Sequence, residues 1–238
     1  MKNLVIDIGN SRIKSALFEE DRLLASPVFD RLEAAVELWT SLDFQLCLVS
    51  SVAIKEPELR AKLPFDFVFL HADTPMPLIN GYATPATLGL DRIAAAIGAW
   101  HLAKQKPALA IDLGTCITYD LVDDKGVYWG GAISPGLKMR AKAMHTFTTS
   151  LPEISLTTPP ITHLGDSTGA CLQVGIWSGI RFEMEGFITA YREKFPEISV
   201  YLCGGDAESF DSFAKDHIFV VPNLVLLGLN CILNHHVA

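Results

Sequence analysis

The chain has 238 residues, of which 50% are hydrophobic and 19% are charged, and its formal net charge is −8. This composition excludes a disordered chain and predicts one large domain or two small ones with a sizeable core. The acidic balance, without any run of basic residues, argues against nucleic acid or an anionic membrane as a partner.

Cysteine usage and the N-terminal residues bear on the cellular compartment. The five cysteines are scattered and include no C-x-x-C pair, so we expect reduced core residues and not zinc ligands or disulfides. No secretory signal follows the first methionine, and no apolar run approaches the length of a membrane span. We therefore expect a cytoplasmic protein.

The first part of the chain predicts alternating strands and helices. A strand over residues 4–6 enters a polar turn and a second strand returns over 13–18, which predicts an opening hairpin. Apolar residues at helical spacing predict a helix over 31–39, and β-rich runs follow at 46–52 and 65–70. This alternation is typical of a layered α/β fold.

The rest of the chain continues the alternation after a turn-rich segment over residues 74–85. The expected elements are, in chain order, a helix over 91–104, a strand over 108–111, a loop over 130–136, a helix over 137–147, irregular chain over 148–160, a helix over 166–194, a strand over 201–203 and a helix over 223–233. Four glycines recur along the longest helix, and we interpret them as sites of close helix packing.

One short pattern occurs twice in the sequence. Residues 4–11 and 109–116 align without a gap at an offset of 105 residues, and each places an Asp and a Gly after an apolar strand. Such a spacing predicts two related half-domains, over residues 1–106 and 107–238.

Each copy of the pattern has the chemistry of a phosphate site. A glycine turn lets backbone N–H groups approach phosphate oxygens, and Asp7 or Asp112 supplies a carboxylate for a cation. Arg12 and Lys14 follow the first copy on one face of the returning strand. An ordinary hairpin with two solvated cations is the alternative for one copy, but two facing copies favour a phosphoryl-transfer cleft. The motifs of P-loop and dinucleotide folds are absent.

A third acid lies at the start of a predicted helix, in Gly89-Leu90-Asp91-Arg92. A carboxylate there can accept a proton from a substrate hydroxyl, and Arg92 is suited to bidentate capture of a substrate carboxylate. The alternative is that Asp91 only caps its helix and Arg92 is solvated.

Several short segments follow one another in a specific order along nearly the whole chain. They are Asp7 to Ser11, Tyr82 to Arg92, Asp112 to Thr115, Gly130 to Gly136, Leu151-Pro152, Thr168 with Gln173 and Gly175, Gly204-Gly205, Pro222 to Leu224 and Gly228-Leu229. In this ordered set the chain resembles the type III pantothenate kinase family. The resemblance implies two similar actin-like (ribonuclease H-like) α/β halves around a nucleotide cleft, as in acetate and sugar kinases, heat-shock proteins and actin. It also implies ATP-dependent phosphorylation of pantothenate to 4'-phosphopantothenate, the first step of coenzyme A biosynthesis.

The resemblance also implies roles for individual residues. Asp91 would be the proton acceptor, Asp7 would lie near Mg²⁺ through water, and Asp112 would help to hold a monovalent cation, K⁺ or NH₄⁺. The implied ATP-binding residues are Asp7, Ile8, Gly9, Asn10, Ser11, Arg12, Ile13, Lys14, Thr115, Gly204 and Gly205. The implied substrate-binding residues are Tyr82, Gly89, Leu90, Asp91, Arg92 and Thr168.

The resemblance further implies a homodimer in which a second copy completes the substrate pocket. The sequence departs from the family at Ala83-Thr84 and at Cys116, which affects details of the pocket. A kinase for another small hydroxylated substrate and a non-catalytic accessory protein of the same fold are the alternatives. The intact acids at positions 7, 91 and 112 favour an enzyme.

Overall fold

Two mixed β-sheets form the framework of the protein, for which a computed structural model describes residues 1–10 and 12–237. The first sheet contains β1 (Lys2–Ile8), β2 (Ile13–Glu19), β3 (Arg22–Ala25), β4 (Val28–Phe29), β5 (Leu46–Ser51) and β6 (Val68–Phe69). The second contains β7 (Ile79–Asn80), β8 (Ala108–Leu113), β9 (Cys116–Val122), β10 (Val127–Pro135), β11 (Ser199–Cys203) and β12 (Ile218–Val220). The helices are α1 (Leu32–Ser41), α2 (Glu56–Lys62), α3 (Leu90–Leu102), α4 (Leu137–Thr146), α5 (Thr168–Lys194) and α6 (Leu224–His236), with 3₁₀ turns at Pro85–Thr87 and Ala207–Phe213.

The two sheets have the same topology. The strand order is β3-β2-β1-β5-β6 in the first and β10-β9-β8-β11-β12 in the second, where β7 adds an edge strand. In each sheet a hairpin supplies the first two strands, and a parallel strand pairs with the other side of the first strand. The predicted pair of related half-domains therefore exists as two copies of one strand pattern.

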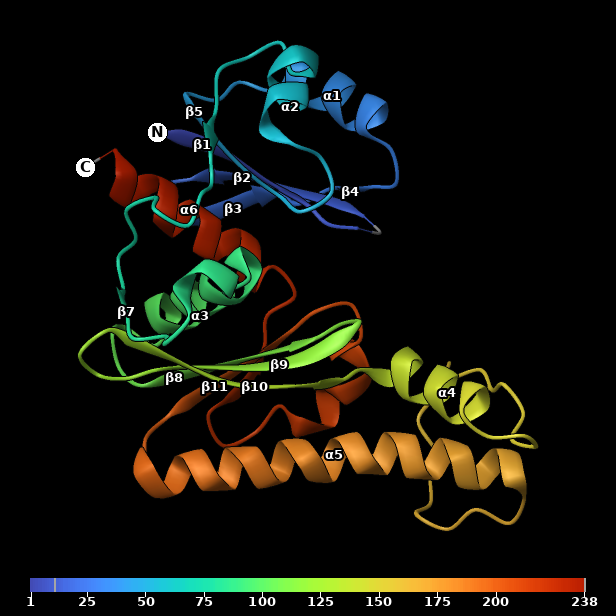
Figure 1. Ribbon diagram of the computed structural model, residues 1–238. Helices are drawn as coiled ribbons and strands as arrows, with labels where there is room; N and C mark the ends of the chain where they lie inside the picture. Colours follow the sequence, from blue (N-terminus) through green and yellow to red (C-terminus); the bar gives the residue numbers. More distant parts are fainter. Residues whose placement is uncertain (11, 238) are drawn as a thin grey trace.

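Helices α3 and α6 lie between the sheets, while α1 and α2 cover the outer face of the first sheet and α5 that of the second (Figure 1). Strands covered on both faces need apolar side chains on both, which explains the continuous run over residues 4–6. Leu4 and Ile6 pack with Trp39 of α1, and Val5 packs with Leu229 of α6.

The two central helices cross at glycines. A Cβ atom on Gly228 of α6 would lie 1.8 Å from the carbonyl oxygen of Ala94 in α3, and one on Gly98 would lie 2.5 Å from the carbonyl oxygen of Leu224. Only glycine permits this approach of two backbones. By contrast, a Cβ on Gly169, Gly175 or Gly186 of α5 would meet no atom within 4 Å. Our interpretation of the α5 glycines as sites of close packing is therefore wrong within the chain, and the close crossing lies at α3 and α6.

Each central helix covers the sheet of the other half. Helix α3 precedes residue 106 and packs on β8 and β9 of the second sheet, whereas α6 ends the chain and packs on β1 and β5. The buried amide of Asn3 in β1 donates to Asn230 and Asn234 of α6, at 2.8 and 2.7 Å. The boundary between residues 106 and 107 stays a prediction.

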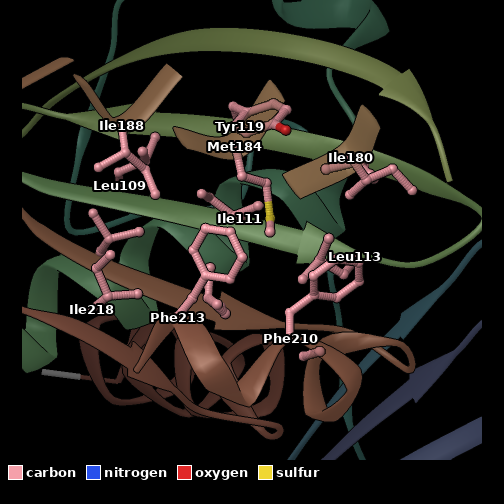
Figure 2. Close-up of a cluster of buried hydrophobic side chains, with 14 of the residues drawn as sticks. Leu109, Ile111, Leu113, Tyr119, Ile180, Met184, Ile188, Phe210, Phe213 and Ile218 are labelled. Carbon is pink, nitrogen blue, oxygen red and sulfur yellow. The ribbon is translucent and has the colours of Figure 1, made fainter. Parts of the chain in front are cut away.

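The outer core of the second half lies between its sheet and α5. Figure 2 shows Leu109, Ile111 and Tyr119 of the sheet facing Met184 and Ile188 of α5. The 3₁₀ turn and β12 close one side of this core with the side chains of Phe210, Phe213 and Ile218. This core supports β8 and β9, the two strands that the second acidic turn joins.

One predicted element is wrong, and several are missed. Residues 130–135, expected as a loop, belong to β10 and pair antiparallel with β9 around a bulge between Tyr128 and Gly130. Gly130 has a φ of +76°, and the Tyr82 ring covers the place where its Cβ would be. Gly130 and Gly131 therefore mark a bulge and a close packing contact instead of a loop. The sequence analysis also missed α2 and the short strands β3, β4, β7 and β12.

The other predicted helices and strands are present with ends shifted by a few residues. Among residues 1–10 and 12–237, no helix combines the length and apolar character that crossing a membrane requires.

Candidate active site

The first acidic turn joins β1 to β2. Its register pairs Ile8 with Ile13 and Asp7 with Lys14, and the Gly9 N–H donates to the Arg12 carbonyl at 3.0 Å. Buried Ile8 and Ile13 anchor the strand ends, while Asn10 and Arg12 are exposed at the tip. The hairpin thus places Lys14 beside the Asp7 carboxylate and leaves Arg12 exposed at the tip. Ser11, predicted with this turn, lies outside the described residues.

The second acidic turn joins β8 to β9 and is contacted by two further predicted segments. Gly114 N–H donates to the Cys116 carbonyl at 3.0 Å, and Thr115 is exposed at the tip. The N–H of Gly136, at the end of β10, donates to the Thr115 carbonyl at 3.1 Å. A Cβ on Gly204 would lie 2.4 Å from Asp112 Oδ1, and this glycine has a φ of +95°. The glycine turn after β11 therefore packs against the Asp112 carboxylate itself.

The two turns face each other closely enough for their carboxylates to interact. Burial raises the pKa of Asp7 to about 6, repulsion from Asp91 and Asp112 adds to this, and Lys14 opposes it. Burial likewise raises the pKa of Asp112 to about 6, with opposition from Lys14 and a further rise from Asp91 and Asp120. Desolvation and like charge are the usual causes of such shifts. Three acids predicted from separate motifs thus share one electrostatic site beside Lys14.

Asp91 lies in the first turn of α3, where the sequence predicted an N-cap or first-turn acid. Gly89 is the N-cap residue, and a Cβ at that position would lie 2.5 Å from Asp91 Oδ1. The same oxygen accepts a hydrogen bond from the Arg92 N–H at 2.9 Å. Because Asp91 is exposed while Leu90 is partly buried, the carboxylate remains accessible to a bound molecule.

Arg92 does not have the solvated position of the alternative interpretation. It is buried, and its Nη2 donates to Asp120 Oδ1 at 2.7 Å. The Tyr128 hydroxyl donates to the same oxygen at 2.8 Å. The guanidinium carbon lies 5.7 Å from the centre of the Tyr82 ring, within the range of a cation–π contact. The sequence predicted Tyr82 and Arg92 for the site, and the two contact each other. It missed Asp120, which binds Arg92, and Tyr128, which binds Asp120.

A signal for Asp120 exists in the sequence. It is the one acid inside the apolar run Ile117–Val122, and a charge in a buried strand needs a partner. Nothing local identifies Arg92 as that partner, because the two residues meet only when α3 packs on β9. Tyr128 also meets Asp120 only through strand pairing.

Within the chain, Thr168 lies away from Arg92 and the three acids. It is exposed at the first position of α5 and borders a shallow hollow with Met144, Leu151 and Asp166. Figure 1 shows the start of α5 beside α4, at the far end of the second sheet from β7.

The acids have the chemistry for oxygen-seeking cations but not a complete protein cage. Among the described residues, no three His, Cys, Asp or Glu side chains come together as a metal-binding group. Mg²⁺ keeps several waters and is commonly held by one or two carboxylates with substrate phosphates. The partly buried carboxylates of Asp7 and Asp112, which repel each other, fit that mode of binding.

Comparisons with known proteins were made over the whole chain. A sequence profile of the type III pantothenate kinase family matches residues 3–190. The type III pantothenate kinase of Phocaeicola vulgatus is 41% identical over 241 residues, covering 98% of each chain. That of Cytophaga hutchinsonii is 40% identical, covering 99% of this chain and 100% of its own. The chain belongs to the type III pantothenate kinase family. The family predicted from the ordered motifs is therefore confirmed.

Solved structures confirm the predicted fold class. Component A of (R)-2-hydroxyglutaryl-CoA dehydratase from Acidaminococcus fermentans superposes with a TM-score of 0.54 and 12% identity, covering 99% of this chain and 98% of its own. The ROK hexokinase of Thermus thermophilus gives 0.52 and 14%, with full coverage of both chains. An activator of 2-hydroxyisocaproyl-CoA dehydratase from Clostridium difficile, solved with bound ADPNP, gives 0.52 and 13%, covering 99% and 94%. The type III family member described here has the actin-like fold of acetate and sugar kinases.

Proposed function

We propose that this protein transfers the γ-phosphoryl group of ATP to the primary hydroxyl of pantothenate and so forms 4'-phosphopantothenate in the first step of coenzyme A biosynthesis. One observation carries the proposal: Asp91 lies close enough to raise the pKa of both Asp7 and Asp112, beside Lys14, in a chain about 40% identical to type III pantothenate kinases along its whole length. Phosphoryl transfer needs little more than positioning and neutralisation of charge.

The triphosphate would bind between the two acidic turns. In the first turn, residues 7–14 including Ser11 would contact phosphate, with backbone N–H groups and Lys14 neutralising its charge. In the second, Thr115 would contact the phosphates, and Gly204 and Gly205 would lie along the adenosine. Two observations support this assignment: Gly204 packs directly against Asp112, and the next residue, Gly205, is exposed with open space at its Cβ position.

Asp91 would act as the proton acceptor. The substrate hydroxyl oxygen forms a bond to the γ-phosphorus as its proton passes to the Asp91 carboxylate, and the bond from phosphorus to the β–γ bridging oxygen breaks to release ADP. The support is positional: Asp91 is the exposed acid of the three and adjoins Arg92 at the start of α3. A positioned base of this kind contributes about 10²- to 10⁴-fold to the rate.

Two cations complete this proposal. Mg²⁺ near Asp7, through water, would supply charge neutralisation for the phosphate oxygens. Asp112 would help to hold K⁺ or NH₄⁺ on the opposite turn. The support is that both carboxylates have raised pKa values, so a nearby cation relieves their desolvation and mutual repulsion.

The substrate would bind along the start of α3. Tyr82, Gly89, Leu90 and Arg92 would line the pocket, and Arg92 would bind the pantothenate carboxylate. A guanidinium is suited to this because it presents parallel donors to both carboxylate oxygens. The protein carries a net charge of −8, so capture of an anion depends on such local donors and not on long-range steering.

A homodimer accounts for Thr168. In one chain this residue begins α5 beside α4, away from α3. We propose that Thr168 of a second copy completes the pocket. The large apolar side chains exposed near the start of α5 support an interface there, among them Phe147, Ile161 and Leu164. A cytoplasmic location remains part of the proposal, supported by the free cysteines.

The test measures ADP release by the purified full chain with and without pantothenate, in potassium and in sodium buffer. We expect pantothenate-dependent ADP that is greater in potassium. Asp91→Asn should lower kcat by about 10²- to 10⁴-fold and leave ATP binding intact, whereas Asp66→Asn, an exposed surface change, should leave kcat unaltered. Turnover of another small alcohol instead of pantothenate would support the rival kinase, and ATP binding without turnover would support the accessory protein.

A further inference from the structure

We propose that Asp120 is a positioning residue for substrate binding, which holds the Arg92 guanidinium toward the carboxylate of the substrate. The inference rests on the proposed function and adds to it a determinant of preference for an anionic substrate. Asp120 would not touch the substrate; it would act through Arg92, with Tyr128 fixing its own orientation.

Side chains from two other elements bind one oxygen of Asp120. Asp120 Oδ1 accepts from Arg92 Nη2 at 2.7 Å and from the Tyr128 hydroxyl at 2.8 Å. These side chains come from β9, α3 and β10, and both Asp120 and Tyr128 are fully buried. A buried side chain held by packing is a fixed point on which a long flexible Arg side chain can be oriented.

The ion pair between Arg92 and Asp120 is incomplete. Arg92 Nε and Asp120 Oδ2 are both buried and have no hydrogen-bond partner among the described residues. An ion pair that served only stability would gain by using both carboxylate oxygens, because buried charges are costly unless fully paired. The contact with Asp120 uses only Nη2 of the guanidinium, so its other terminal nitrogen remains for a second carboxylate, whereas the buried Nε is not accessible to one.

The other acids near Arg92 would compete with Asp120 for its guanidinium. Asp91 is adjacent to Arg92 in sequence, and Asp7 and Asp112 interact with Asp91. A mobile Arg92 would be attracted to this acidic cluster and would neutralise the proposed proton acceptor. Asp120 holds the cation on the inner side of α3, and the Tyr82 ring, 5.7 Å from the guanidinium carbon, restricts its plane.

The test compares Asp120→Asn, Tyr128→Phe and a matched control, Asp123→Asn. Asp123 is also a buried acid of the same hairpin, but its carboxylate accepts from Lys125, Val127 and Trp129 in the β9–β10 turn. Asn at position 120 keeps the size of the side chain and one acceptor oxygen. Kinetics are measured with ATP, with pantothenate and with its neutral primary-alcohol analogue, whose affinity is taken from competition with pantothenate.

We expect Asp120→Asn to raise the KM for pantothenate about 10- to 100-fold, the range for losing a hydrogen bond to a charged group. The KM for ATP, the affinity for the neutral analogue and kcat should change less than about threefold, as expected for uniform binding. Tyr128→Phe should raise the pantothenate KM less, and Asp123→Asn should change only thermal stability.

A purely structural role for Asp120 would weaken pantothenate and its neutral analogue equally, or would raise the KM for ATP as well. Either result overturns the inference, as does an unchanged pantothenate KM in Asp120→Asn. Wild-type protein without pantothenate-dependent turnover would overturn the proposed function, and the inference with it. Normal wild-type turnover with no loss of anion preference in Asp120→Asn would overturn the inference alone.

Discussion

The two acidic hairpins share a scaffold but differ in charge. In both, Asp is the second-last residue of a strand that ends with Ile or Leu, and the turn closes through the N–H of a glycine. The residue paired with Asp7 across the first hairpin is Lys14, whereas the residue paired with Asp112 across the second is Thr118. Between the last paired residues, the first turn has four residues and the second has three. The first hairpin therefore has a cationic side chain opposite its Asp, and the second hairpin does not.

We propose that this difference gives the two hairpins different roles. A turn with an internal cation suits an anionic phosphate chain, while a turn with an acid and a neutral hydroxyl suits a bound cation. The same division explains why Lys14 opposes the rise in pKa at both acids while no second cation does so from the other hairpin.

The largest expected effect tests this division directly. Lys14→Met should lower kcat/KM for ATP by about 10²- to 10³-fold, as expected for loss of one electrostatic donor at a transferring phosphoryl group. Thr118→Val, at the equivalent place in the second hairpin, should cost less than about tenfold. Steady-state kinetics with varied ATP measure both, and equal losses would mean that the hairpins are not specialised.

The next effect tests the equivalence of the two central helices. Gly228→Ala should lower the free energy of unfolding by about 1–3 kcal/mol, because the new Cβ would overlap the Ala94 carbonyl. Gly98→Ala should cost less, since its closest contact is longer. Gly186→Ala in α5, where a Cβ meets open space, should stabilise by about 0.5–1 kcal/mol. Denaturant unfolding measures all three, and a neutral Gly228→Ala would contradict the close crossing.

The smallest effect concerns the unliganded second hairpin. Because the pKa of Asp112 is raised from 3.8 to about 6 in the folded protein, this carboxyl lowers the stability as pH rises from about 3.8 to about 6, and the full loss remains at higher pH. Asp112→Asn should therefore raise the free energy of unfolding at pH 8 by about 1–2 kcal/mol, while lowering activity. Thermal melting without ligands at pH 4.5 and 8 checks this. The gain should be smaller at pH 4.5, where the folded carboxyl is protonated, and a less stable variant at pH 8 would be the opposite result.

The sequence was most informative where function depends on neighbours along the chain. The Asp-x-Gly turns and the Gly89–Arg92 segment carry their chemistry within a few residues, so both hairpins and the start of α3 could be predicted. The acids of these three segments were also expected to share one cleft, and the rise that Asp91 causes in the pKa of Asp7 and of Asp112 agrees with that.

The features that escaped prediction depend on contacts between distant elements. Asp120 meets Arg92 across 28 positions of sequence, and no local pattern shows which cation neutralises a buried acid. Gly130 was interpreted as loop, because its positive φ and its contact with the Tyr82 ring arise only when β10 has paired. The glycines of α5 were assigned to close packing by their number, but spacing alone does not reveal what lies opposite.

The exchange of covering helices between the halves has a consequence for biosynthesis. During synthesis on the ribosome, Val5 on the inner side of β1 is made long before Leu229 and its neighbours in α6, with which it packs. Until α6 has been made, the first half exposes an apolar face, which is a site for aggregation or chaperone binding. A nonsense codon before α6 would leave this face of β1 and β5 without its covering helix.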